Sequence, residues 1–163
     1  MSLEFRIRAA RADDIESVIA LERSIASAPH WPEAEYAAIP GADAGGAVRR
    51  CLLVAERGAK ERQGDLIGFA VGKVIGAGAG AVAELESVAV AEQARRTGVG
   101  RALCAATIEW SLAEGAANVE LEVRSTNISA IGLYDRLGFV RTGLRRGYYR
   151  DPEEDAVLMQ RQI

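Results

Sequence analysis

The feature that most constrains this chain is the junction at residues 86–104, where an apolar run meets a basic, glycine-containing turn and then a helical pattern. Residues 88–90 predict the end of a buried strand, and residues 95–100 predict a tight loop before the helix. The first turn of a helix presents unpaired N–H groups, and Gly98 and Gly100 allow an anion to approach the backbone closely. The basic side chains at the junction are Arg95, Arg96 and Arg101. The junction therefore predicts an anion site.

Two better-known phosphate motifs do not fit this junction. No Gly-Lys-Ser/Thr sequence is present, as a P-loop requires, and the third glycine of a dinucleotide-binding fingerprint is missing. A glycine pair before a helix also occurs in purely structural turns, and basic residues there can form a solvated face. The pattern alone leaves both interpretations open.

Length and composition predict a single domain over residues 1–163. The net charge of −3 and the lack of a basic run argue against nucleic acid as a partner. Residues 1–11 are charged, and no apolar run reaches membrane-spanning length, so we expect a cytoplasmic protein without a membrane partner. Cys51 and Cys104 lack metal-ligand spacing, which predicts no metal and two small core residues.

Hydrophobic periodicity predicts an α/β domain with a mixed central sheet. Asp13 is expected to cap the first helix. A break at residues 29–33 precedes a short helix through Tyr36, and the Gly/Ala segment 41–46 is expected to be the mobile edge of the site. A turn is expected at residues 58–64. The expected strands are 5–8, 51–55, 66–75, 81–90, 119–123, 139–144 and 155–160, and the expected longer helices are 13–27, 98–114 and 127–137.

Five short runs, in order, resemble the GNAT superfamily of acetyl-CoA-dependent N-acetyltransferases. Within it, the chain is most similar to the RimI family of ribosomal-protein-alanine N-acetyltransferases. The runs are the Arg-x-x-Gly-x-Gly loop at 95–100, Glu-Val-Arg-x-x-Asn at 122–127, Ala-Ile-x-Leu-Tyr at 130–134, Leu-Gly-Phe at 137–139 and Arg-Arg-x-Tyr-Tyr at 145–149. The similarity covers roughly residues 84–160. Near the start, where that family usually has Pro-Trp-Ser-Glu, this chain has His-Trp-Pro-Glu at 30–33.

The resemblance implies a mostly antiparallel central sheet flanked by helices, with a V-shaped split between two parallel strands that end near Val90 and Val123. It implies acetyl-CoA as co-substrate, with the pantetheine arm in the split and the pyrophosphate on the loop. No metal is expected. The implied cofactor-binding residues are Val88, Ala89, Val90, Arg95, Arg96, Thr97, Gly98, Val99, Gly100, Arg101, Asn127 and Tyr134.

The resemblance also implies catalytic roles, with Glu122 as general base and Tyr134 as general acid for the departing thiolate. A backbone N–H near Val88 would donate to the oxyanion. Glu86 is the rival base, because other GNAT enzymes keep theirs on the preceding strand. Taken without the resemblance, Glu122 could be a solvent-facing carboxylate and Tyr134 a core residue. Asn127 could simply cap the next helix.

The implied acceptor is the α-amine of a protein or peptide N-terminus, such as that of a ribosomal protein. The residues expected to frame its groove are Trp31, Glu33, Tyr148 and Tyr149. His30, the only histidine, is expected to pack within the substrate loop. Two alternatives remain at this point, namely acetylation of a small-molecule amine or lysine side chain, and a coenzyme-A-binding module without turnover. Retention of both Glu122 and Tyr134 argues against the second.

Overall fold

A seven-stranded sheet forms the centre of the computed structural model, which describes residues 2–42, 45–58 and 64–163. The strand order is β1-β2-β3-β4-β5-β7-β6, and every neighbouring pair is antiparallel except β4 with β5. The expected mixed, mostly antiparallel sheet is therefore confirmed. The strands are β1 (Phe5–Ala9), β2 (Val48–Arg57), β3 (Leu66–Ile75), β4 (Val82–Val90), β5 (Asn118–Arg124), β6 (Val140–Tyr149) and β7 (Glu154–Gln162).

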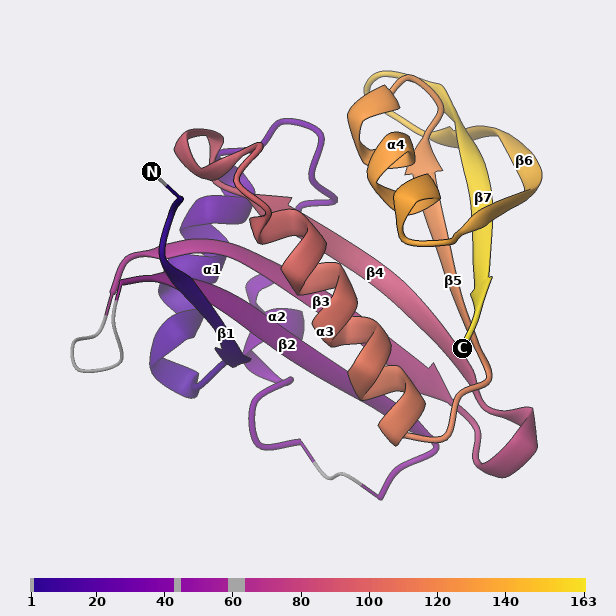
Figure 1. Cartoon of the computed structure of the whole chain (residues 1–163), viewed down its shortest axis with the longest axis horizontal. Helices are drawn as coiled ribbons and strands as arrows, with labels where there is room; N and C mark the ends of the chain where they lie inside the picture. Colours follow the sequence, from indigo (N-terminus) through magenta and orange to yellow (C-terminus); the bar gives the residue numbers. More distant parts are fainter. Residues whose placement is uncertain (1, 43–44, 59–63) are drawn as a thin grey trace.

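Helices cover both faces of the sheet (Figure 1). One apolar cluster packs α1 (Ile15–Arg23) and α2 (Glu33–Ala37) against β2, β3 and β4, with Val18, Tyr36 and Phe69 fully buried. A second cluster packs α3 (Val99–Ala113) and α4 (Ile128–Arg136) against β4, β5 and β7. The short 3₁₀ turns are η1 (Ala12–Asp14), η2 (Gly78–Gly80) and η3 (Glu92–Ala94).

Close packing of α3 on the sheet depends on Gly72 in β3. A Cβ atom at this position would lie 2.7 Å from the Thr107 side chain and 3.1 Å from the Cys51 sulfur. Thr107 is fully buried, and its hydroxyl donates to the carbonyl of Leu103 one turn earlier, so the helix buries this polar group at no cost in unpaired hydrogen bonds. The glycine thus fixes how closely the helix that follows the basic loop lies on β3.

The two parallel strands pair only at their beginnings. Ala83 lies opposite Val119 and Glu84 opposite Glu120, and no further pairs are formed although β4 continues to Val90 and β5 to Arg124. On its other side β5 pairs with β7 along its whole length, from Asn118 to Arg124. The strands therefore diverge toward their carboxyl ends, which confirms the expected V-shaped split.

Some local expectations were wrong. The first helix ends at Arg23 rather than at residue 27. Asp13 does not cap it, because the helix begins at Ile15 and Asp13 lies within the preceding 3₁₀ turn. Asp14 is at the N-cap position, but its carboxylate accepts hydrogen bonds from Arg8 and from the backbone N–H of Arg11 instead. The strand expected at 139–144 extends through Tyr149.

Other expectations can be compared only in part. Cys104 is buried, whereas Cys51 is only partly so. Parts of the segments 41–46 and 58–64 lie outside the described residues. Among those described, no helix is both long enough and apolar enough to span a membrane.

A buried ion cluster ties β1 to β2. The Glu56 carboxylate, 2% exposed, accepts hydrogen bonds from Arg6 Nε at 2.7 Å, Arg8 Nε at 3.2 Å and the Gly64 backbone N–H at 2.9 Å. Burial acts to raise the pKa of Glu56, but the hydrogen bonds from Arg8, Arg6 and Gly64 outweigh it and lower the pKa to about 2. The alternating pattern of β1 did not predict this partner, since Glu56 lies far away in the sequence.

We expect Glu56→Gln to destabilise the protein at pH 7 by about 3 kcal/mol. A carboxyl whose pKa is lowered on folding contributes its stability above the unfolded pKa and loses it as pH falls to the folded value. The difference in unfolding free energy between wild type and variant should therefore shrink from pH 5 to pH 2, as measured by urea unfolding. A gap that stays constant over this range would show that packing, and not charge, is responsible.

Candidate functional site

A cleft of about 740 Å³ opens where β4 and β5 diverge. Its walls come from the ends of both strands, the loop between β4 and α3, the first turns of α3 and α4, and the segment after α1. The lining residues are Ile25, Ser27, Val88, Ala89, Val90, Ala94, Arg95, Arg96, Gly98, Gly100, Arg101, Arg124, Thr126, Asn127, Ser129, Ala130, Leu133, Tyr134 and Arg136.

The loop before α3 has the backbone geometry of an anion site. Arg96 and Gly98 both adopt left-handed conformations, with φ of 63° and 91°. Gly98 precedes the first residue of α3, and no side chain caps this helix end. The first N–H groups of α3 are therefore available to a ligand, and the helix dipole adds positive potential there. At Gly100, a Cβ atom would meet only Leu133 and Val90, both at 3.6 Å.

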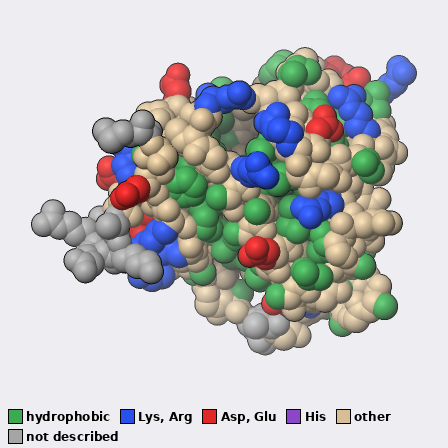
Figure 2. Space-filling model, in the orientation of Figure 1, with side chains coloured by type: hydrophobic (Ala, Val, Ile, Leu, Met, Phe, Trp, Pro, Cys, Tyr) green, Lys and Arg blue, Asp and Glu red, His purple; other side chains and the backbone are tan. Residues whose placement is uncertain are grey.

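The charge of the cleft is strongly one-sided. Five arginines line it and, among the described residues, no aspartate or glutamate does. In Figure 2, Lys and Arg side chains gather around a hollow near the start of α3. This concentration occurs in a chain with a net charge of −3, so it is a local feature and not a property of the whole surface.

Most of the predicted cofactor-binding residues line this cleft. The two exceptions are Thr97, whose hydroxyl donates to the Ala94 carbonyl, and Val99, which is buried in the core against the sheet. Sequence reasoning missed Arg124, Ser129 and Leu133 among the lining residues, although all three fall within or beside the runs singled out above. It also missed Ile25 and Ser27, for which the sequence carries no signal.

Two of the predicted site residues that line the cleft belong to α4, namely Tyr134 within the helix and Asn127 at its N-cap. Tyr134 packs edge-on against Phe139, with ring centroids 5.8 Å apart, and burial raises the pKa of its hydroxyl. The phenol therefore keeps its proton through the neutral range. Asn127 Oδ1 accepts a hydrogen bond from the Ala130 N–H at 3.2 Å, so its predicted helix-capping role is confirmed.

Glu122 does not line the cleft. It alternates with the buried residues Leu121 and Val123, which places it on the opposite face of β5. Its Oε1 accepts a hydrogen bond from Arg145 Nη1 at 2.9 Å. The pKa of Tyr148 is raised, first by a hydrogen bond to the Glu122 carboxylate and then by burial, so this tyrosine is a neighbour of Glu122.

Glu86 lies in a different environment. The register with β3 pairs Val71 with Ser87 and Gly72 with Leu85, so Glu86 is the extra residue of a β-bulge. Its carboxylate forms ion pairs with Arg50 at 2.9 Å and Lys73 at 3.0 Å, and its side chain is 8% exposed. Of the residues that the structure describes, two cations therefore pair with the Glu86 carboxylate, whereas one pairs with that of Glu122.

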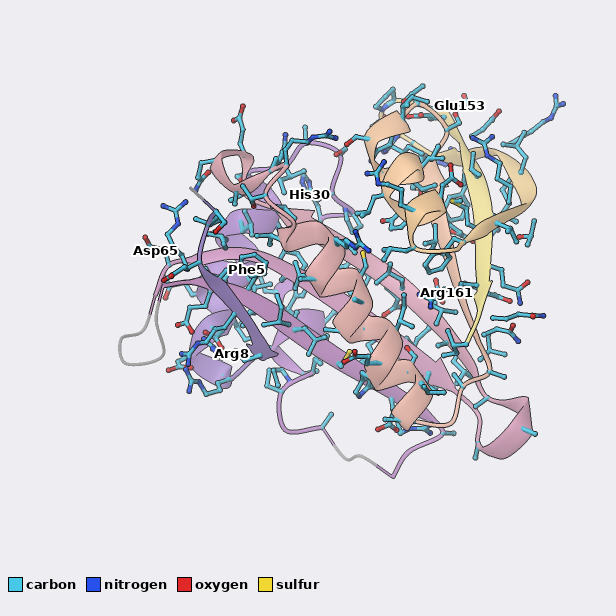
Figure 3. The ribbon with its side chains drawn as sticks, in the orientation of Figure 1. Phe5, Arg8, His30, Asp65, Glu153 and Arg161 are labelled. Atoms are coloured by element: carbon cyan, nitrogen blue, oxygen red, sulfur yellow. The ribbon has the colours of Figure 1, made fainter. Side chains whose placement is uncertain are left out.

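The predicted acceptor residues fall into two groups. Trp31 stacks on Tyr36 at 5.3 Å, and its backbone N–H donates to the buried carboxylate of Glu22 at 3.0 Å. The Tyr36 hydroxyl also donates to Glu22. His30, which precedes Trp31 in the sequence, lies toward the end of the molecule where α3 begins (Figure 3). The sequence did not predict that Trp31 would contact Glu22 and Tyr36.

The second group lies on β6, where the rings of Tyr148 and Tyr149 meet edge-on at 5.0 Å. Arg124 lies over the Tyr149 ring at 4.3 Å. Burial, followed by the charge of Glu122, raises the pKa of Tyr149 to about 12. Glu33 begins α2 and is exposed. No interaction between described residues joins Trp31 or Glu33 to the two tyrosines, so their shared role in a groove stays a prediction.

Comparisons with known proteins agree with this geometry. The Acetyltransferase (GNAT) family model matches residues 15–139. The curated [Ribosomal protein bS18]-alanine N-acetyltransferase of Escherichia coli K12 is 43% identical over 79 residues, covering 47% of this chain and 53% of that protein. The chain thus spans about half the length of the curated relatives that it matches.

Two solved structures extend the comparison to nearly the whole chain. The ribosomal-protein-S18-alanine N-acetyltransferase from Escherichia coli has a TM-score of 0.74 at 29% identity, covering 98% of this chain and 94% of that one. Arabidopsis thaliana NAA60 in complex with acetyl-CoA has a TM-score of 0.82 at 20% identity, covering 98% and 99%. The second likeness is one of fold alone.

We expect Gly100→Asp to abolish binding of coenzyme A, because a Cβ atom and a negative charge would be placed at the anion site. Gly100→Ala is the matched control, since the surrounding side chains leave ordinary contact distance for a methyl group. It should weaken binding less and leave the melting temperature near that of wild type. Calorimetric titration with coenzyme A measures both variants, and an unchanged Kd for Gly100→Asp would remove the site assignment.

Proposed function

Because this chain belongs to the Acetyltransferase (GNAT) family, we propose that it transfers an acetyl group from acetyl-CoA to the α-amine of a protein N-terminus in a ternary complex. The observation that carries the proposal is the arginine-lined cleft at the start of α3, which opens between two diverging parallel strands. It suits a long ligand with a charged end and a slender, largely neutral arm.

Different residues of the cleft suit different parts of acetyl-CoA. The uncapped start of α3 and the arginines around it would hold the pyrophosphate. Val88, Ala89 and Val90 on β4 and Leu133 on α4 provide walls for the pantetheine arm, which must run between the strands. The relative from Arabidopsis, which shares this fold, was crystallised with acetyl-CoA.

Each catalytic group has one proton to move. The acceptor nitrogen forms a bond to the acetyl carbonyl carbon, and the bond from that carbon to sulfur breaks. Glu122 takes the proton that the amine must lose, directly or through a water molecule. Tyr134, which keeps its proton at neutral pH, donates it to the departing sulfur. A backbone N–H of β4 near Val88 supports the oxyanion.

An N-terminal amine suits this site better than a lysine. The reference pKa of an α-amine is about 7.7–8.0, so a sizeable fraction is neutral near pH 7, whereas lysine, at about 10.4, is almost wholly charged. A single carboxylate base is therefore sufficient for the α-amine. The Escherichia coli relative carries a name that specifies the alanine of ribosomal protein bS18. We propose a protein N-terminus of this type, such as that of a ribosomal protein, as acceptor here.

We expect peptides that begin with a free alanine to be acetylated at least ~10-fold faster than N-terminally blocked peptides that carry one free lysine, because of this difference in neutral fraction. Mass spectrometry of a peptide library varied at the first residue measures the rate and locates the acetyl group. Equal rates on the blocked lysine peptides would favour a side-chain acetyltransferase. Activity only on small amines would favour a metabolite acetyltransferase, and binding of acetyl-CoA without any transfer would favour a regulatory module.

We expect Glu122→Gln to lower kcat by roughly 10²-fold or more while leaving acetyl-CoA affinity nearly unchanged, since it removes a base and keeps the shape. Glu86→Gln is the matched variant on the neighbouring strand and should retain more activity, because two cations already occupy that carboxylate. Steady-state kinetics on one acceptor peptide compares the two. If Glu86→Gln were inactive and Glu122→Gln active, the base would be Glu86, and the acetyl-CoA site would still stand.

A further inference from the structure

Arg145 on β6 occupies the space beside the proposed base. Its Nη1 lies 2.9 Å from Glu122 Oε1, and its guanidinium carbon lies 4.4 Å from the centroid of the Tyr148 ring. The Arg145 side chain is 54% exposed and that of Glu122 is 25% exposed. A cation therefore already sits where a protonated amine bound to Glu122 would have to lie.

Several other charged or titratable groups surround Glu122. They come from β4, β5, β6 and β7, and those that face it or its tyrosine neighbours are Glu84, Glu120, Arg124, Tyr148, Tyr149 and Glu154. Arg124 is committed elsewhere, to Glu154 at 3.3 Å and to the ring of Tyr149. Among the described residues, Arg145 is the cation that pairs with Glu122.

The pair differs from the one at Glu86 in how easily it can be broken. Lys73 is only 17% exposed and bridges Glu84 and Glu86 at 3.0 Å each, so removing it would leave Glu84 without its cation and Glu86 with Arg50 alone. Arg145 makes one ion pair, is largely solvated, and can turn into water on its flexible stem. Exposed pairs of this kind are weak. An acceptor that binds through its backbone could therefore displace Arg145.

We propose that Arg145 is a positioning residue that holds the acceptor-amine subsite in the free protein and gives way when the acceptor binds. This inference rests on the proposed function. In the free protein Arg145 holds the Glu122 carboxylate in place through this ion pair. In the complex the acceptor amine takes over that contact, so an acceptor must compete with an internal cation for Glu122.

If Arg145 has this role, its loss should affect the acceptor kcat/KM and kcat differently, whereas the loss of a purely structural residue would change both. The kcat/KM of the acceptor reports the free protein, in which Arg145 is engaged, whereas kcat reports the complex, from which Arg145 has withdrawn. Loss of Arg145 should therefore lower the acceptor KM and leave kcat nearly unchanged.

The test measures acceptor kinetics for wild type, Arg145→Gln, Arg145→Lys and Arg146→Gln. Arg145→Gln should lower the acceptor KM by roughly 2- to 5-fold and leave kcat nearly unchanged. Arg145→Lys keeps a cation and should resemble wild type. Arg146, the next residue on the strand, pairs with no carboxylate among the described residues, so Arg146→Gln is the matched control.

The possible outcomes are distinct. An active wild type together with an unchanged acceptor KM in Arg145→Gln would overturn the inference and leave the proposed function standing. A tenfold loss of kcat in Arg145→Gln would also overturn it, because Arg145 would then act within the complex. Calorimetry with the acceptor peptide supplies a second readout, in which Arg145→Gln should bind more tightly. A wild type that neither binds nor acetylates N-terminal peptides would overturn the proposed function and this inference together.

Discussion

The site depends above all on the short pairing between β4 and β5. Only two residue pairs hold these parallel strands together, whereas β5 pairs with β7 along its whole length. The strands separate just before the loop that leads to α3 and the loop that leads to α4. Two helix beginnings therefore meet at one opening, and the backbone donors of the first are left without a capping side chain. Continued pairing of the strands would have closed this opening.

The sheet also divides the proposed chemistry into two electrostatic environments. The cleft is bounded by arginines and by the buried phenol of Tyr134, on the side covered by α3 and α4. Glu84 and Glu86 project to the opposite side, where they share Lys73, and Glu122 projects away from the α4 core toward Arg145. Under this proposal, anion binding would take place beside the arginines of the cleft, and proton removal beside a carboxylate on the other face of the sheet that is already paired with a cation.

The sequence predicted the parts of this arrangement that are local. The ordered motifs predicted the GNAT resemblance, which the family match over residues 15–139 confirms, and the split followed from it. The Asn127 cap was predicted separately, from its position before a helix. Partners distant in the sequence could not be predicted. Glu22 and Glu56 are buried carboxylates whose partners lie up to 50 residues away, and the bulge at Glu86 depends on the register with β3. Val99 is the first residue of α3 and is buried in the core, and the loop motif alone does not predict this burial.

The anchoring of Trp31 has a consequence for how such a chain can diversify. Its segment is held from within, by a carboxylate of α1 and a ring of α2, and neither Glu22 nor Tyr36 lines the cleft. Exposed positions around that anchor, such as Glu33, which does not line the cleft, can change without disturbing either the buried contacts or the arginines of the cleft. Selection could therefore redirect the chain toward a new recognition partner one surface residue at a time, while the part that handles the common donor is inherited intact.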